Sequence, residues 1–407
     1  MDGTVAALAL RIATGEVSAR EAVLDQLARL HAVDDATHAV AWFDDELVAR
    51  EAERLDSLFA RAPHEIGPLH GIPVTVKDWI DVADFPCAGD TGRHDRRPAV
   101  DATAVRRLRD AGAVVIAKTL PWGPEPPHER AVRHPTHADR APGGSSTGEA
   151  VAIAAGGSLV GLGSDSGGSV RLPASWCGVV GYKPTTGLVP TTGHFPRVSD
   201  RHDGRTQIGP LGRCVDDVAR LLQVIAGADG LDSGAPPVSM PWHLPVDLAG
   251  VRFAVVAGDA SSDTETAIEH VASVLTGIGM SRTDWTAPWL ADGMDITTRY
   301  WQRHGQTGAE VDRQLWDWDT FRYRYRREAA GIDLLVTPTT PGVAPTSGPI
   351  DLGQFRFTVP ASLTGSPAIA LPAGRDVDGL PLSVQLVGRP WEDHRLLAIA
   401  RAVESAG

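Results

Sequence analysis

The chain has 407 residues and a formal net charge of −13. Since nucleic acids bind basic surfaces, this charge argues against a nucleic-acid partner. Hydrophobic residues make up 43% of the chain and charged residues 22%, which is typical of a globular protein with a sizeable core. No apolar run reaches the roughly 18 residues of a membrane helix, and residues 1–11 lack the basic start of a signal peptide. We therefore expect a cytoplasmic protein without membrane contact.

The cysteines Cys87, Cys177 and Cys214 are scattered and form no C-x-x-C pair. This spacing indicates neither a disulfide framework nor a zinc site, so we expect buried reduced thiols. The 14 histidines include no H-E-x-x-H motif. We therefore expect no metal and no cofactor.

The basic residues are unusual in type. Lysine and arginine total 38, but the lysines are only Lys77, Lys118 and Lys183. Arginine stays protonated in proteins, whereas a buried lysine can lose its proton and act as a base. Each lysine is therefore a candidate for a role that arginine cannot fill.

Hydrophobic periodicity predicts helices and strands in alternation after an initial helical segment. The run from Ser18 to Leu30 has helical spacing, with Ser18 and Glu21 placed for a capping box. Further helices are expected at 44–59, 102–111, 147–155, 264–278 and from 393. Strands are expected at 72–76, 113–117, 159–163, 251–257, 333–337, 368–371 and 382–387.

Such alternation is typical of an α/β fold, and we expect a central mixed β-sheet with helices on both faces. The Gly/Pro-rich stretch 231–247 is short enough to lie within one domain. We therefore expect a single domain over residues 1–407. It would comprise an N-terminal helical arm (1–65), a core segment with the candidate chemistry (66–220) and the rest of the sheet with a variable substrate region (221–407).

Three segments carry residue types suited to catalysis. Residues 67–78 end an apolar strand at Lys77, where burial would favour a neutral amine that can act as a base. Residues 143–149 read Gly-Gly-Ser-Ser-Thr-Gly-Glu before a helix, with Ser146 and Glu149 at capping-box spacing. Residues 163–174 contain Ser166-Gly-Gly-Ser169, where consecutive glycines allow backbone N–H groups to point one way, as in an oxyanion hole. An ordinary Gly/Ser loop and a salt-bridged lysine are the structural alternatives.

Two rival motifs fit less well. Residues 144–148 match the G-x-S-x-G nucleophile elbow, but the polar, proline-containing residues 134–142 do not predict the strand that this motif requires. An α/β-hydrolase-type esterase with a Ser-His-Asp triad is therefore an alternative. Gly161 and Gly163 follow a strand, but Ser166 occupies the position of the next glycine in a dinucleotide fingerprint.

Together the three segments resemble the amidase signature family. The resemblance is closest at 143–149, 163–174 and Gly178-Val-Val-Gly-Tyr-Lys-Pro-Thr, and it extends to 67–78, 111–119, 208–213, 333–338 and 363–388. It covers nearly the whole chain, and all three lysines fall inside matching segments. Thr147 departs from the pattern, because the family usually has glycine there.

The resemblance implies the site residues. Lys77 would be the base, Ser145 a proton relay after a cis Gly144–Ser145 peptide bond, and Ser169 the nucleophile; the two serines are 24 residues apart, as in the family. The backbone N–H groups of Ser166, Gly167, Gly168 and Ser169 would form the oxyanion hole. Supporting roles would fall to Ser146 at the relay and to Asp165 and Arg171 as a pair that braces the loop.

The implied function is hydrolysis of a small-molecule carboxamide through an acyl-enzyme. A glutaminase-type subunit of an amidotransferase is an alternative, and a homodimer is left open. Five of the eleven tryptophans lie between residues 285 and 318, outside the matching segments: Trp285, Trp289, Trp301, Trp316 and Trp318. Since indole rings supply large apolar contact areas, they suggest an apolar or aromatic substrate, with packing of amphipathic helices as the alternative.

Overall fold

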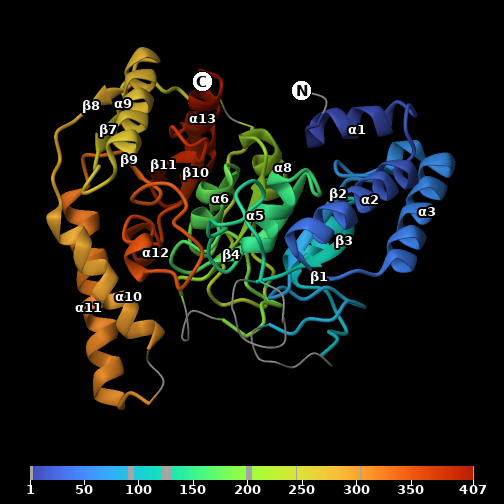
Figure 1. Cartoon of the computed structure of the whole chain (residues 1–407), viewed down its shortest axis with the longest axis horizontal. Coiled ribbons are helices and arrows are strands. Elements are labelled where there is room, and N and C mark those ends of the chain that lie inside the picture. The colour runs from blue at the N-terminus through green and yellow to red at the C-terminus, as the bar shows by residue number, and fades with distance from the viewer. Residues whose placement is uncertain are drawn as a thin grey trace.

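The computed structural model describes residues 3–89, 96–121, 131–198, 204–243, 245–302 and 305–406. In these ranges the chain forms a mixed, eleven-stranded sheet with the order β1-β3-β2-β4-β6-β5-β10-β11-β9-β7-β8. Helices pack along the sheet, and α10 and α11 lie at the opposite end of the molecule from α1 to α3 (Figure 1). The predicted α/β class with a central mixed sheet is confirmed.

The N-terminal elements are mainly helical, as predicted. They are α1 (Val5–Ala13), α2 (Ala19–Thr37), β1 (Val40–Trp42), α3 (Asp45–Arg61) and η1 (Pro63–Glu65). The capping box at Ser18 and Glu21 is present, since the Ser18 hydroxyl accepts from the Glu21 N–H and the Glu21 carboxylate accepts from the Ser18 N–H. This reciprocal pair fixes where α2 begins.

The next part of the chain alternates strands and helices. Its elements are β2 (Pro73–Lys77), α4 (Thr103–Asp110), β3 (Val114–Thr119), α5 (Thr147–Ala154), β4 (Val160–Asp165), α6 (Arg171–Cys177), β5 (Val180–Lys183), β6 (Gln207–Gly212) and α8 (Val215–Ile225). Strands β2, β3 and β4 are fully buried, which explains why they read as continuous apolar runs. Strands β5 and β6 had not been predicted, because they are short and contain glycine or proline in place of a clear apolar run.

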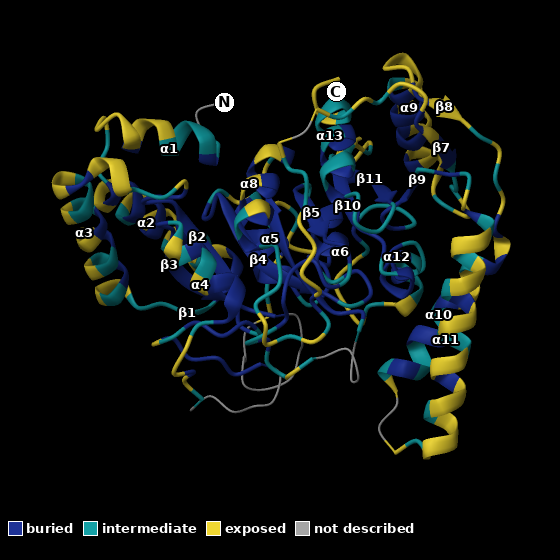
Figure 2. Cartoon of the chain, turned by 180° about the vertical axis from the view of Figure 1, so that it is seen from behind, coloured by how far each residue is buried: buried dark blue, intermediate teal, exposed yellow. Residues whose placement is uncertain are grey.

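The C-terminal part completes the sheet. It contains β7 (Arg252–Val255), α9 (Ser262–Gly277), β8 (Ser281–Arg282), η2 (Pro288–Ala291), α10 (Asp292–Trp301), α11 (Gly308–Glu328), β9 (Leu334–Pro338), η3 (Leu352–Phe355), α12 (Val359–Thr364), β10 (Ala368–Arg375), β11 (Pro381–Gly388) and α13 (Asp393–Glu404). Buried residues concentrate in the strands, while the outer faces of α3, α9 and α11 are exposed (Figure 2). No helix within the described ranges combines the length and apolar character required to cross a bilayer.

Two groups of parallel strands set where ligand-facing residues can lie. Strand β2 pairs in parallel with β3 and β4, and β7 pairs in parallel with β8 and β9. Side chains that follow the carboxyl ends of parallel strands meet at one edge of a sheet, where α/β proteins commonly bind ligands. Lys77 ends β2 and Asp165 ends β4, so the predicted base and nucleophile loop meet at such an edge.

Candidate active site

Lys77 and Ser145 form the central contact of the site. The Lys77 ammonium nitrogen lies 2.7 Å from Ser145 Oγ and 3.0 Å from Ser164 Oγ. The same nitrogen lies 3.8 Å from the centroid of the Trp79 ring. Lys77 is fully buried, so its position at the end of an apolar strand places the amine against hydroxyl groups and away from bulk water.

Ser145 reaches this position through the turn that precedes α5. The Ser146 N–H donates to the Ser169 carbonyl at 3.1 Å, which ties the two serine segments together. The predicted capping box at Ser146 and Glu149 is wrong: the Ser146 hydroxyl instead contacts the backbone N–H and carbonyl of Ser164. Ser146 thus supports the site as predicted, by joining the turn to β4.

The predicted cis bond between Gly144 and Ser145 is also wrong for this structure. Among the described residues the cis peptide bond is Phe195–Pro196, and Gly144–Ser145 is trans. The Thr147 hydroxyl donates to the Gly144 carbonyl and holds this peptide in the observed orientation. Thr147 is the position where the sequence departs from the family's glycine, so the departure and the different geometry occur at the same turn.

Ser169 follows β4 in a tight loop that Asp165 organises. One Asp165 oxygen accepts from the Gly168 N–H at 2.7 Å, and the other accepts from the Val170 N–H at 3.2 Å. Gly168 has a φ of +140°, a conformation that favours glycine. Since the Gly168 N–H is directed at Asp165, it is not free to serve as an oxyanion donor here, which leaves Ser166, Gly167 and Ser169 of the predicted set.

Arg171 locks this loop from behind. Its guanidinium donates to both Asp165 oxygens at 2.9 Å, and both side chains are fully buried. Burial alone would raise the pKa of Asp165, but the charge and hydrogen bonds of Arg171 outweigh it and hold that pKa below its ordinary value. The predicted bracing pair is therefore present in the structure.

Ser145 and Ser169 line one cavity of about 450 Å³, which we call the serine cavity. Within the part of the chain that the structure describes, no hydrogen bond joins their two hydroxyl groups. The other side chains of the wall are mostly apolar, and the described lining residues include no charged one: Trp79, Ser164, Ser166, His194, Pro196, Val198, Thr206, Trp301, Leu352 and Phe355. Ser164, Trp79 and Phe355 had not been singled out; a serine in a fully buried strand was the available signal for Ser164.

Trp301, from the tryptophan-rich segment, stands directly over the nucleophile loop. A Cβ atom on Gly167 would lie 2.7 Å from its indole, so only glycine fits beneath the ring. The indole also packs edge-on against Phe355 at a centroid distance of 5.6 Å. The other four tryptophans differ: Trp289 is buried, Trp316 is 73% exposed, and Trp285 and Trp318 line separate cavities.

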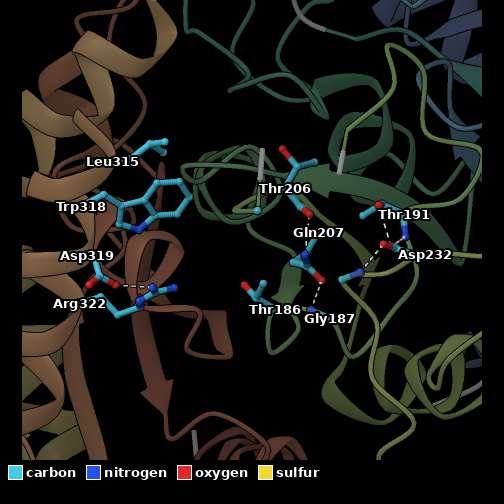
Figure 3. A pocket seen from close by; sticks show the side chains of 12 residues that line it. Thr186, Gly187, Thr191, Thr206, Gln207, Asp232, Leu315, Trp318, Asp319 and Arg322 are labelled. Atoms are coloured by element: carbon cyan, nitrogen blue, oxygen red, sulfur yellow. Dashed lines mark hydrogen bonds and ion pairs between the residues drawn. The ribbon is translucent and has the colours of Figure 1, made fainter. Parts of the chain in front are cut away.

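A second cavity of about 370 Å³ adjoins the first, because Thr206 lines both. Helix α11 contributes Trp318, Asp319 and Arg322, which face Gln207 and Asp232 of the core (Figure 3). The Arg322 guanidinium contacts Asp319 at 2.5 Å. This polar cavity offers hydrogen-bonding groups beyond the apolar serine cavity.

His194 bears on the Ser-His-Asp alternative, because it lines the serine cavity. Its Nδ1 lies 2.8 Å from the Pro196 carbonyl oxygen, which can only accept, so this nitrogen carries the proton. A triad histidine would instead be oriented by a carboxylate at that atom. In addition, no strand lies within residues 131–146, which precede the supposed elbow.

Comparisons with known proteins agree with this geometry. A model of the Amidase family matches residues 21–314 and 291–397. A glutamyl-tRNA(Gln) amidotransferase subunit from Prochlorococcus marinus (strain MIT 9303) is 32% identical over 465 aligned residues, which cover 95% of this chain and 93% of that protein.

Two solved structures extend the comparison to the fold. A 6-aminohexanoate cyclic dimer hydrolase superposes with a TM-score of 0.86 at 27% identity, covering 99% of this chain and 96% of that chain. A peptide amidase in complex with the competitive inhibitor chymostatin has a TM-score of 0.81 at 26% identity, covering 99% and 97% of the respective chains. The chain therefore belongs to the amidase signature family.

Proposed function

We propose that this chain hydrolyses a carboxamide, with Ser169 as nucleophile, Ser145 as proton relay and Lys77 as base. The observation that carries the proposal is the 2.7 Å contact between Lys77 Nζ and Ser145 Oγ beside a cavity that Ser169 also lines. A hydroxyl is a weak nucleophile until a base removes its proton, and a neutral amine can do so.

The first half of the reaction forms an acyl-enzyme. Neutral Lys77 accepts the proton of Ser145 while Ser145 accepts that of Ser169, and the Ser169 oxygen bonds to the amide carbon. The resulting oxyanion would be stabilised by the backbone N–H groups of Ser166, Gly167 and Ser169. This step requires the two serine hydroxyls to come within hydrogen-bond distance when substrate is bound; catalytic hydrogen bonds are often longer in ligand-free structures.

The second half releases both products. The tetrahedral intermediate collapses, the C–N bond breaks, and the proton held by Lys77 passes through Ser145 to the leaving nitrogen. Water then attacks the ester carbon and gives its proton to the same relay. The Ser169 oxygen leaves as the acid forms, and the hydroxyl is restored.

The lining of the serine cavity supports an uncharged, apolar group next to the scissile amide. Trp79, Trp301 and Phe355 supply aromatic contact area, and the described lining offers no charged partner for an α-amino or α-carboxylate group. A longer substrate would extend past Thr206 into the polar cavity.

A series of primary amides from acetamide to phenylacetamide and long-chain acyl amides tests the substrate class. Each buried methylene contributes about 0.8 kcal/mol, so kcat/KM for ammonia release should rise about fourfold per added methylene until the cavity is full. A preference for urea, or for glutamine over apolar amides, would contradict this part of the proposal.

Glutaminase activity within an amidotransferase is the second candidate, favoured by the 32% identity to the Prochlorococcus amidotransferase protein over most of both chains. Free glutamine carries two charges near its side-chain amide. The apolar serine cavity makes this candidate the weaker one.

A further inference from the structure

A third cavity, which we call the aromatic cavity, lies apart from the two already described. It has a volume of about 510 Å³ and shares no lining residue with the serine cavity. It opens at the carboxyl ends of the parallel strands β7 and β9, where Val255–Asp259 and Thr337 contribute to its wall. Strand ends of this kind are common ligand sites, and the volume lies within the range of small-molecule pockets.

The chemistry of the wall selects the occupant. Trp285, Tyr325 and Phe357 supply aromatic surface, and Trp285 packs edge-on against Tyr325 at a centroid distance of 6.3 Å. The charged lining groups neutralise one another, because Arg356 Nε lies 2.9 Å from Asp259 Oδ1. A neutral aromatic molecule therefore matches this wall better than an ion does.

The segment from Phe355 to Thr358 separates the aromatic cavity from the serine cavity. Phe355 lines the serine cavity, whereas Arg356 and Phe357 line the aromatic one. The Thr358 hydroxyl donates to the Gly167 carbonyl at 2.6 Å, so the same segment is bonded to the nucleophile loop. A molecule that packs against Phe357 therefore presses on a wall that holds this loop.

A buried hydrogen-bond path runs between the same two places. The Gln385 amide nitrogen donates to Thr337 Oγ1 at 2.8 Å and to the Phe357 carbonyl at 2.9 Å. The Gln385 oxygen accepts from Arg171 at 2.6 Å, and Arg171 grips Asp165, which organises the loop before Ser169. Gln385, Arg171 and Asp165 are fully buried, so a displacement at one end has little room to be absorbed.

We propose that the aromatic cavity is a second binding site for a small neutral aromatic molecule, and that its occupancy changes turnover at the serine cavity through the wall 355–358. The binding half does not depend on the proposed function. The coupling half rests on it, because it needs a measurable turnover.

Binding is tested with N-phenyl-1-naphthylamine, a neutral probe that fluoresces in apolar surroundings. Ala257 lines the aromatic cavity, so Ala257→Phe should fill it and weaken probe binding at least tenfold. Ala260→Phe, in the same loop but outside the lining, is the matched control and should bind within twofold of wild type. Leu352→Trp crowds the serine cavity and should also leave the affinity within twofold.

Probe binding that survives Ala257→Phe and is lost in Leu352→Trp would place the probe in the serine cavity and overturn the site. Absence of binding to wild type would overturn it as well. Since fluorescence needs no turnover, neither result depends on whether the chain is an amidase.

Coupling is then measured as amide hydrolysis with and without saturating probe. We expect kcat to change at least twofold in wild type and in Ala260→Phe, with KM unaltered, and to stay constant in Ala257→Phe. A rise in KM alone would indicate competition in the serine cavity. Either that result or unchanged kinetics in wild type would overturn the coupling.

Discussion

At the scale of single residues, the three lysines show why arginine cannot replace them. All three are fully buried, yet their partners differ. Lys77 contacts two serine hydroxyls, Lys118 lies 3.4 Å from Asp78, and Lys183 donates to the Pro184 carbonyl. Burial lowers the pKa of Lys183 to about 7, which shows how strongly this interior disfavours a charged amine.

Lys77→Arg should be nearly as damaging as Lys77→Ala. Arginine keeps the charge but cannot release its proton near neutral pH, and loss of a general base typically costs about 10²–10⁴-fold in rate. The measurement is kcat/KM on the best amide, with circular dichroism to show that both variants fold. An arginine variant that keeps more than a tenth of wild-type activity would mean that Lys77 is a structural cation.

Glu149 gives the interior a pH-dependent element. Its two carboxyl oxygens accept from Thr75 and Thr119 at 2.7 Å, and burial raises its pKa to about 8. Because this carboxyl ionises near pH 4.5 when unfolded and near 8 when folded, its contribution to folding is full below about 4.5 and is lost as pH rises to about 8.

Glu149→Gln removes that ionisation while keeping the side-chain shape. The Tm of the variant relative to wild type should therefore increase steadily between pH 5 and pH 8. Thermal melts at several pH values provide the measurement. A difference in Tm that is independent of pH would show that Glu149 is already ionised in the folded protein.

At the scale of elements, the helices of the tryptophan-rich segment combine packing with substrate contact. Trp289 donates to Glu328 at 2.8 Å and Trp318 donates to the Leu363 carbonyl at 2.7 Å, which are structural roles. Trp301, at the end of α10, instead covers Gly167 in the serine cavity. The two interpretations drawn from the sequence therefore apply to different members of the same cluster.

Trp301→Ala should lower kcat/KM for phenylacetamide about tenfold more than for acetamide, because a small acyl group does not reach the indole. Loss of about 1.4 kcal/mol of apolar contact corresponds to that factor. Trp316→Ala, in the same segment but 73% exposed, is the control and should change neither value. Equal losses on both substrates would mean that Trp301 only supports the loop.

The sequence predicted the buried parallel strands and their helices well, because long apolar runs with capping residues are local signals. It predicted Lys77, Ser145 and Ser169 through the resemblance, and the structure brings Lys77 and Ser145 into direct contact. The partners of the nucleophile loop could not be predicted, since Thr358 and Gln385 are 191 and 214 residues away from the groups that they contact. The direction of the Gly168 N–H likewise depends on Asp165 side-chain geometry, which local pattern does not encode.

At the scale of the whole molecule, one sheet connects the serine cavity with the aromatic cavity. The strand order passes from β2 and β4 through β11 to β9 and β7 without interruption. The single domain expected over residues 1–407 and the homodimer left open stay predictions. The amidase family membership is shown, whereas independence from a partner protein is proposed.

Purified chain should therefore hydrolyse apolar amides without any added protein. Size-exclusion chromatography coupled to an activity assay provides the measurement, and ammonia release should follow the peak of this chain alone. Activity that appears only in a fraction with a co-purified partner, together with preference for glutamine, would favour the amidotransferase role.

The most direct test of the account is covalent labelling of the nucleophile. Wild-type protein treated with a fluorophosphonate should gain the mass of one phosphonyl group, and peptide mapping should place it on Ser169. Ser169→Ala should remain unlabelled while folding normally, and Ser145→Ala should label at least a hundredfold more slowly. A label on another residue, or undiminished labelling of Ser169→Ala, would contradict the assignment of Ser169 as the nucleophile.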